Sequence, residues 1–305
     1  MNISSSGVIL GIFFGIFSGG FVAFIIEYFD NTIKSIDQIE RRGIYILAII
    51  PAIKKNKKNR KSRKYLSKMP DVDKLQRRLI TTEDPKSPIS EAYRGLRTSM
   101  MYNSSNKKCS IILVSSSGPG EGKTTTIANT AITYANLDKK TLLIDADLRK
   151  PVIHNIFKLD KTPGLTSYLS GYSNIDQIIN KSDIPNLDIL TSGIIPPNPS
   201  ELLNSKKMEG LLEKLKDKYD VIMFDTPPLI AVTDGYILMK FVTQFMLVIR
   251  SGVTQKLALE RVLNDLKHNN IKLSGAVLNA VSEEHTYGAG YYDYYQYYAS
   301  ESNEK

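Results

Sequence analysis

A glycine-rich segment of this chain carries the residue types that bind phosphate. Residues 117–125 read SGPGEGKTT, after the apolar stretch 109–116 and before a stretch of helical character that reaches residue 137. Glycines let backbone N–H groups approach phosphate oxygens, and a following helix N-terminus adds partial positive charge. The Lys123 side chain can reach the β- and γ-phosphates of a nucleotide, and the Thr124 hydroxyl can bind Mg²⁺. The residues expected to contact the nucleotide are Gly118, Pro119, Gly120, Glu121, Gly122, Lys123, Thr124 and Thr125.

This segment departs in one place from the strict phosphate-loop pattern G-x-x-x-x-G-K-S/T. Ser117 stands where that pattern has its first glycine. The alternative is an ordinary glycine-rich loop that happens to end in GKTT. The apolar stretch before it and the helical stretch after it are the context that a phosphate loop requires.

Carboxylates follow two further apolar runs. Asp145 and Asp147 end the run TLLIDAD, and Asp225 ends the run VIMFD. A single aspartate at a strand end often only caps the next helix. Three of them at the sheet edge that holds a phosphate loop indicate metal-assisted phosphoryl transfer, which needs negative ligands for Mg²⁺ and a base or orienting group near the acceptor oxygen.

Apolar strand-like segments alternate with helical ones over most of the chain. The predicted strands lie within residues 109–117, 141–149, 187–193, 219–228, 244–250 and 272–281, and helical stretches such as 201–217 and 254–268 separate most of them. This alternation predicts an α/β fold, a doubly wound and mostly parallel sheet with helices on both faces. Ligands of such folds bind beyond the carboxyl ends of the strands. The whole pattern is that of a P-loop NTPase.

The N-terminal region has a different character. Residues 7–29 are apolar and uncharged until Glu27, which is long enough for one transmembrane helix. No positive region precedes them and no small-residue cleavage site follows, so a signal peptide is disfavoured. The basic run 54–68 lies on their C-terminal side, which predicts a cytoplasmic location for the bulk of the protein. A short helix and an apolar strand at residues 44–50 are expected between them.

Charge and composition restrict the partners. The net charge of +9 is concentrated in the basic run 54–68, which either lies against anionic membrane lipid or is a solvated linker. Since the charge is compact rather than diffuse, we expect no nucleic-acid partner. The single cysteine, Cys109, excludes an intrachain disulfide, and three widely spaced histidines show no metal-site pattern.

Seven of the seventeen tyrosines lie in the last nineteen residues, in a segment interrupted by Gly288 and Gly290. Such an end is either an adhesive surface or a set of attachment sites. The phosphate loop and the strand-end aspartates favour the second interpretation, a substrate attached to its own enzyme. The predicted phosphoacceptors are Tyr287, Tyr291, Tyr292, Tyr294, Tyr295, Tyr297 and Tyr298.

Taken together, these motifs resemble those of the bacterial tyrosine kinases of capsule and exopolysaccharide export. The segments SSSGPGEGKTTT, LLIDADLRKP, IIPPNPSELL and VIMFDTPP and the tyrosine-rich end all resemble that family. The resemblance implies an ATP- and Mg²⁺-dependent tyrosine kinase in which Lys123 binds phosphates, Thr124, Asp147 and Asp225 hold Mg²⁺, and Asp145 is the candidate base. It also implies autophosphorylation in trans within a ring. Glu91, Arg94 and Arg97 match the family's E-x-x-R-x-x-R ring-assembly motif, with an exposed salt-bridged helix as the alternative.

The N-terminal stretch 7–35 resembles the second transmembrane helix and juxtamembrane end of the Wzz-type membrane adaptor of these kinases. The chain lacks the first transmembrane helix and the large extracytoplasmic region of the fused family pattern. The implied partners are membrane lipid, the adaptor and polysaccharide export machinery, and a cognate tyrosine phosphatase. The implied location is the bacterial inner membrane, single-pass, with the kinase domain in the cytoplasm. The predicted division is an extracytoplasmic end (1–6), a transmembrane helix (7–29), a juxtamembrane segment and basic linker (30–88), a kinase domain (89–282) and a flexible tail (283–305).

Two other functions compete with tyrosine transfer. A partition- or septum-positioning ATPase would carry a lysine where Gly118 stands, so this function is disfavoured. A membrane scaffold with a nucleotide-operated switch is compatible with the motifs. Asn279, at the end of the last predicted strand, is the candidate adenine contact, with a capping or exposed asparagine as the alternative.

Overall fold

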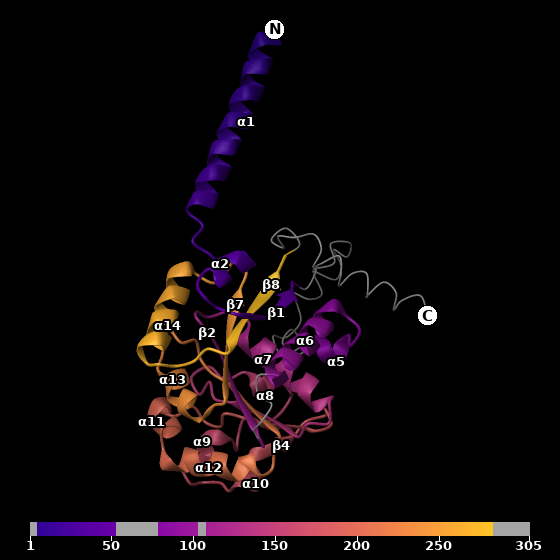
Figure 1. The fold of residues 1–305 in the computed structure, drawn as a ribbon, viewed down its shortest axis with the longest axis vertical. Helices are drawn as coiled ribbons and strands as arrows, with labels where there is room; N and C mark the ends of the chain where they lie inside the picture. Colours follow the sequence, from indigo (N-terminus) through magenta and orange to yellow (C-terminus); the bar gives the residue numbers. More distant parts are fainter. Residues whose placement is uncertain (1–4, 53–78, 103–107, 283–305) are drawn as a thin grey trace, which may run out of the picture.

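The computed structural model describes residues 5–52, 79–102 and 108–282. The basic run 54–68 and the seven predicted phosphoacceptor tyrosines therefore lie outside the described residues. Within them, helices lie on both sides of one sheet, and helix α1 stands away from the body (Figure 1).

The sheet has eight strands in the order β1-β8-β7-β2-β6-β3-β5-β4. All neighbours pair in parallel except the short edge strand β4, which is antiparallel to β5. The predicted α/β fold is confirmed. The predicted strands correspond to β2 (Ser110–Ser116), β3 (Thr141–Asp145), β5 (Leu187–Leu190), β6 (Val221–Asp225), β7 (Gln244–Arg250) and β8 (Gly275–Val281), whereas β4 (Ile179–Lys181) was not anticipated.

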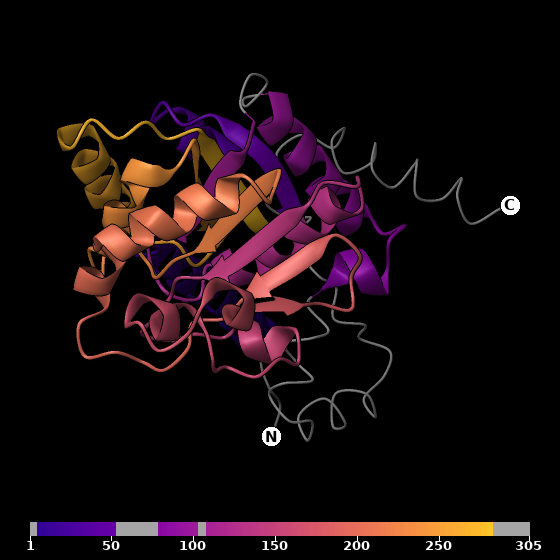
Figure 2. The same cartoon turned by 90° about the horizontal axis from the view of Figure 1, so that it is seen from below.

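Helices cover both faces of this sheet, as the end-on view in Figure 2 shows. One core contains side chains of β1, α6 (Pro88–Tyr102) and α7 (Lys123–Ala135). The other includes residues of α2 (Ile36–Glu40), α9 (Leu165–Leu169), α11 (Pro199–Leu203), α12 (Lys206–Lys216), α13 (Asp234–Leu238) and α14 (Lys256–His268). Short α5 (Ile80–Glu83), α8 (Ile153–Ile156), α10 (Ile175–Ile178) and the 3₁₀ turn η1 (Met239–Phe241) complete the described elements. Central strands buried on both faces explain the near-continuous apolar runs.

The segment that follows α1 is part of the same sheet structure. Strand β1 (Ile46–Pro51) forms where the apolar run 44–50 predicts a strand, and it pairs in parallel with β8. Ahead of it, the Ile33 N–H donates to the Thr254 carbonyl at 2.8 Å, and the Gly252 N–H donates to the Ile33 carbonyl at 2.8 Å. The segment that follows α1 is thus hydrogen-bonded to the turn between β7 and α14.

Helix α1 (Ser5–Tyr28) lies where a transmembrane helix is predicted. Over the ranges that the structure describes, no helix has both the length and the apolar character needed to cross a membrane. The predicted transmembrane helix is therefore not confirmed.

Candidate active site

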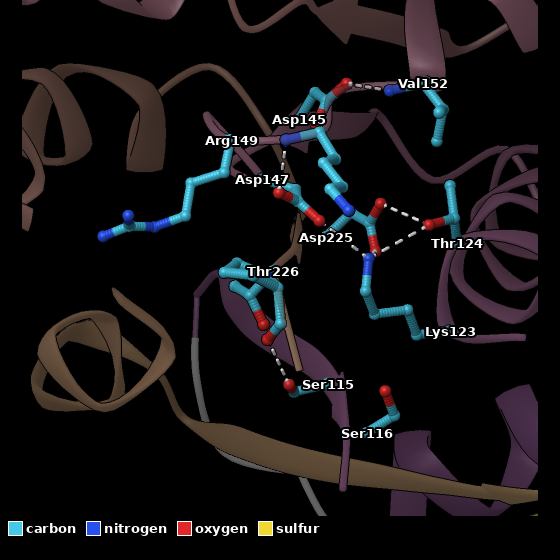
Figure 3. A network of polar contacts seen from close by, with 12 residues as sticks. Ser115, Ser116, Lys123, Thr124, Asp145, Asp147, Arg149, Val152, Asp225 and Thr226 are labelled. Atoms are coloured by element: carbon cyan, nitrogen blue, oxygen red, sulfur yellow. Dashed lines mark hydrogen bonds and ion pairs between the residues drawn. The ribbon is translucent and has the colours of Figure 1, made fainter. Parts of the chain in front are cut away.

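The order of the strands brings the predicted site residues together. The phosphate loop follows β2, Asp225 ends β6, and Asp145 ends β3, and these three strands are neighbours with β6 in the middle. Asp145 and Asp225 are directly paired in register. Parallel strands end at one edge of the sheet, so Lys123, Thr124 and the aspartates face a common space (Figure 3).

The phosphate loop has the backbone of an anion cradle. Gly120 and Gly122 have φ values of +76° and +97°, a region that residues with a side chain rarely adopt. A Cβ atom at Gly122 would also collide with the Asn279 side-chain amide. Helix α7 begins at Lys123, so the N–H groups of its first turn have no partner within the helix and point toward the loop. Free N–H groups and the helix dipole favour an anion here.

The Lys123 ammonium lies among the carboxylates. Its Nζ is 3.1 Å from Asp147 Oδ2 and 3.6 Å from Asp225 Oδ1. It also donates to Thr124 Oγ1 at 3.3 Å. Burial lowers the pKa of Lys123, but the charges of Asp225 and Asp147 outweigh burial and the net pKa is raised. Lys123 is therefore a fixed positive charge at the site.

The two paired carboxylates are fully buried. Asp145 Oδ2 accepts from the Val152 and Ile153 N–H groups at 3.2 and 3.0 Å, and Asp225 Oδ2 accepts from Thr124 Oγ1 at 2.7 Å. Burial, followed by the charge of Asp225, raises the pKa of Asp145 to about 8. Burial also raises the pKa of Asp225, although Lys123 and Thr124 act in the opposite direction. The site thus holds more negative than positive charge and favours an added cation.

The oxygen atoms of the site fit a magnesium ion. Asp145 Oδ1 and Asp225 Oδ1 are buried and have no hydrogen-bond partner. Carboxylate and hydroxyl oxygens are the ligands that Mg²⁺ prefers, usually one or two from the protein with water and phosphate completing the shell. In the part of the chain that the structure describes, no three acidic, histidine or cysteine side chains form a cage for a metal on their own. The site therefore offers oxygen ligands of the kind that Mg²⁺ prefers.

Arg149, two residues after Asp147, points away from this cluster (Figure 3). Its Nε and Nη2 donate to the two oxygens of buried Asp234 at 2.8 and 3.1 Å, and Ser200 Oγ donates to Asp234 Oδ1 at 2.6 Å. Asp234 and Ser200 were not anticipated from the sequence. Their contacts fix the loop that carries Asp147 to helices α11 and α13.

Glu121 and Asn279 both contact the loop itself. The Glu121 carboxylate accepts from the Ser117 and Gly118 N–H groups at 3.2 and 2.8 Å, and its side chain is buried. This side chain points into the loop, so the predicted contact of Glu121 with the nucleotide would be made by its backbone. Asn279 Nδ2 donates to the Glu121 carbonyl at 2.9 Å, so its side chain lies against the phosphate loop. Arg250, which sequence reasoning missed, donates to the Gly120 carbonyl at 2.9 Å.

The predicted ring-assembly motif lies on α6, away from the aspartates. Arg94 pairs with Glu91 on the helix surface and donates to the Pro85 carbonyl at 2.7 Å. Arg97 donates to the Thr133 carbonyl at 2.9 Å and so ties α6 to α7. The apolar side chains of this helix are buried at Tyr93, Leu96 and Met100 and partly buried at Ile89. Glu91 and Arg94 are therefore the outward members of the motif.

Comparison with known proteins shows similarity to one family model and to several tyrosine-protein kinases. Residues 109–272 match a family model described as an AAA domain. The chain is 44% identical over 217 residues to the tyrosine-protein kinase YwqD of Bacillus subtilis, covering 70% of this chain and 92% of that protein. It is 31% identical over 284 residues to the tyrosine-protein kinase etk of Escherichia coli, covering 90% of this chain and 38% of that protein. Among solved structures, the kinase domain of the E. coli tyrosine kinase ETK superposes with a TM-score of 0.73 at 30% identity, covering 85% of this chain and 99% of that domain.

The two relatives differ in length. The chain spans nearly all of the first but little more than a third of the second. The similarity to the second extends over 90% of this chain, so it includes sequence outside the 164 residues of the AAA match.

Proposed function

The chain belongs to the bacterial tyrosine-protein kinases, and on that premise we propose that it uses ATP and Mg²⁺ to phosphorylate its own C-terminal tyrosines in trans within a ring. The observation that carries this proposal is the convergence of Lys123 and Thr124 with Asp145, Asp147 and Asp225 at one sheet edge. Phosphoryl transfer depends mainly on positioning and on charge stabilisation, which this set of groups can supply.

Each side chain of the set has a distinct proposed role. The N–H groups at the start of α7 and the Lys123 ammonium bind the phosphates and stabilise the charge that develops on them. Thr124, Asp147 and Asp225 would hold Mg²⁺, directly or through water. When bound, that ion would neutralise charge on the phosphate oxygens. The remaining step is delivery of a tyrosine hydroxyl to the terminal phosphate.

Asp145 is the proposed proton acceptor. A tyrosine hydroxyl has an ordinary pKa of about 10, so a nearby carboxylate helps to make it a nucleophile at neutral pH. Burial and Asp225 raise the pKa of Asp145 to about 8, so its ionised form is a stronger base than an ordinary aspartate, and an added cation would favour that ionised form at neutral pH. Its Oδ1 has no hydrogen-bond partner and is the atom that would take the proton. Because Asp145 is fully buried, the tyrosine has to enter the space around Lys123 to reach it.

A mixing experiment tests transfer in trans. One chain carries Lys123→Met and an intact tail, and the other has an intact site with its seven tail tyrosines changed to phenylalanine. After incubation with ATP and Mg²⁺, mass spectrometry should find phosphotyrosine on the Lys123→Met tail only in the mixture. ATP hydrolysis without any phosphotyrosine would favour the partition-type ATPase. ATP binding with neither hydrolysis nor tyrosine phosphorylation would favour the membrane scaffold with a nucleotide-operated switch.

Location and partners form a second part of the proposal. Helix α1 exposes five phenylalanines, each by more than half of its side chain: Phe13, Phe14, Phe17, Phe21 and Phe24. Exposed apolar surface of this kind favours burial in lipid. We propose that the chain associates with the inner membrane through this region, with the kinase domain on the cytoplasmic side. Co-flotation with anionic lipid vesicles, lost when the five phenylalanines are changed to serine, tests this association.

The cellular role follows from the family resemblance. We propose control of capsular or exopolysaccharide synthesis and export, with the membrane adaptor, the export machinery and a cognate tyrosine phosphatase as partners. Each phosphate adds nearly two negative charges to the tail. Accumulated charge should withdraw the tail from a neighbouring site and favour monomers. Size analysis of dephosphorylated and phosphorylated chains tests this, and equal sizes in both states would exclude it.

A further inference from the structure

Glu121 is an unusual buried charge within the phosphate loop. Its side chain is 2% exposed. Among the ion pairs formed by the described residues, none involves this carboxylate, since the neighbouring Lys123 faces Asp147 and Asp225 instead. A buried carboxylate without a cation is costly unless hydrogen bonds satisfy it. Its partners therefore indicate what it does.

Those partners all belong to the loop or to one adjoining turn. The carboxylate accepts the Ser117 and Gly118 N–H groups at 3.2 and 2.8 Å, and the Thr254 hydroxyl is close enough to favour its ionised form. A Cβ at Gly118 would lie 3.2 Å from Oε1, so the glycine permits this close approach. Burial raises the pKa of this carboxyl to about 7, and its hydrogen bonds act in the opposite direction. The carboxyl group thus occupies the first half of the loop, while the N–H groups at the start of α7 stay free for phosphate.

Thr254 is itself held in place. Its hydroxyl accepts the Arg250 N–H at 2.8 Å, so the hydroxyl proton is not used in that bond and is available to the neighbouring Glu121 carboxyl group. The Arg250 guanidinium donates to the Gly120 carbonyl at 2.9 Å. The Thr254 side chain is 1% exposed. The turn between β7 and α14 therefore contacts the loop at both the Gly120 carbonyl and the Glu121 carboxylate.

We propose that Glu121 is a positioning residue for nucleotide binding: its carboxylate, oriented by Thr254, holds residues 117–118 so that the second half of the loop is shaped for phosphate. A glutamine could satisfy only one of the two N–H groups with its oxygen, because its amide nitrogen donates and would oppose the other. This role of Glu121 depends on the proposed function in one respect, namely that the loop binds ATP.

The test compares nucleotide binding by variants of the full 305-residue chain. The variants are Glu121→Gln, Thr254→Val, the conservative Thr254→Ser and the double change of Glu121→Gln with Thr254→Val. Glu213→Gln, on the exposed surface of α12, is the matched control for loss of a glutamate charge. ATP and ADP affinity are measured by displacement of a fluorescent nucleotide, the KM for ATP and kcat by phosphotyrosine formation, and stability by thermal unfolding.

The expected result separates positioning from stability. Glu121→Gln should weaken ATP binding and raise the KM for ATP by about tenfold, with kcat at saturating ATP changed by less than about threefold. Thr254→Val should weaken binding about threefold and Thr254→Ser should restore it. The double variant should bind no more weakly than Glu121→Gln, because both changes act through one carboxylate.

Other results would overturn the inference. The inference is excluded if Glu121→Gln binds ATP within twofold of the unaltered chain. It is also excluded if the losses of ATP affinity in the two single variants add up in the double variant. If Glu121→Gln does not fold, the test is the comparison of Thr254→Val with Thr254→Ser. Equal ATP affinities of these two variants would exclude the positioning role. An unaltered chain that binds ATP but forms no phosphotyrosine would refute the proposed kinase function and leave this inference standing.

Discussion

Asp145 and Asp225 face each other in register on the parallel strands β3 and β6, both fully buried, and the single ammonium of Lys123 serves both. Because one ammonium faces two carboxyl groups, it cannot neutralise both of them when they are ionised. This explains why the same residues that suit a magnesium nucleotide should weaken the folded chain when no cation is added.

Replacement of Asp145 by asparagine should stabilise the metal-free protein and abolish phosphotransfer. Burial and Asp225 raise the pKa of Asp145 to about 8 in the folded state. The unfolded chain releases this proton near its ordinary pKa of about 4. Ionisation therefore weakens the folded state as pH rises from about 4 to about 8. At pH 8.5 without metal, Asp145→Asn should melt about 3 °C higher than the unaltered chain, with the difference vanishing near pH 4.

Thermal unfolding across pH checks this directly. Asp183→Asn, at an exposed position, is the matched control and should leave the melting temperature unchanged. A lower melting temperature for Asp145→Asn at pH 8.5 would show that the two carboxylates do not repel each other as inferred.

Lys123→Met should remove phosphotransfer. The change deletes the cation that lies 3.1 Å from Asp147 and 3.6 Å from Asp225. Loss of one preorganised group that stabilises transition-state charge typically lowers kcat by about 10²- to 10³-fold. Quantitative phosphotyrosine mass spectrometry measures the effect. Lys108→Met removes an exposed lysine paired with Asp217 and should retain full activity; undiminished activity in Lys123→Met would mean that the site lies elsewhere.

Gly122→Ala should prevent tight nucleotide binding. The residue has a φ of +97°, and a Cβ there would collide with the Asn279 amide. We expect at least a tenfold loss of ATP affinity in a fluorescent-nucleotide titration. Gly210→Ala is the control, because this glycine lies within α12 with open space around it, and the change should stabilise the helix by about 0.5–1 kcal/mol. Normal ATP binding by Gly122→Ala would contradict the cradle geometry.

Changes on α6 should separate assembly from folding. Arg94 pairs with Glu91 on the surface, whereas Arg97 bonds the Thr133 carbonyl of α7. Arg94→Ala and Glu91→Ala should each reduce ring assembly in sedimentation velocity without lowering the melting temperature by more than about 1 °C. Arg97→Ala should lower both ring assembly and the melting temperature, because it breaks a contact between α6 and α7. Arg261→Ala, exposed on α14, should alter neither, and intact rings in Arg94→Ala would exclude this face as the interface.

Local patterns in the sequence were sufficient to predict the phosphate loop, the α/β class and seven of the eight strands of the sheet. A buried strand, a helix start and a glycine-rich turn each depend on neighbouring residues, so their signals are readable along the chain. The family motifs extended this prediction to the chemistry. The short antiparallel strand β4 carries no comparable signal, because three partly polar residues become a strand only when β5 lies beside them.

How these local elements meet depends on the packing of the whole fold. The position of β6 between β2 and β3 pairs Asp145 with Asp225, and no spacing along the chain specifies that order. The same holds for side-chain direction: Arg149 turns to Asp234, and Glu121 turns inward to Ser117, Gly118 and Thr254. The residue types that suit phosphate and metal, and their spacing, can be recognised along the chain. Long-range packing determined which of them lie together, because burial and hydrogen bonding between distant segments select one arrangement of charges.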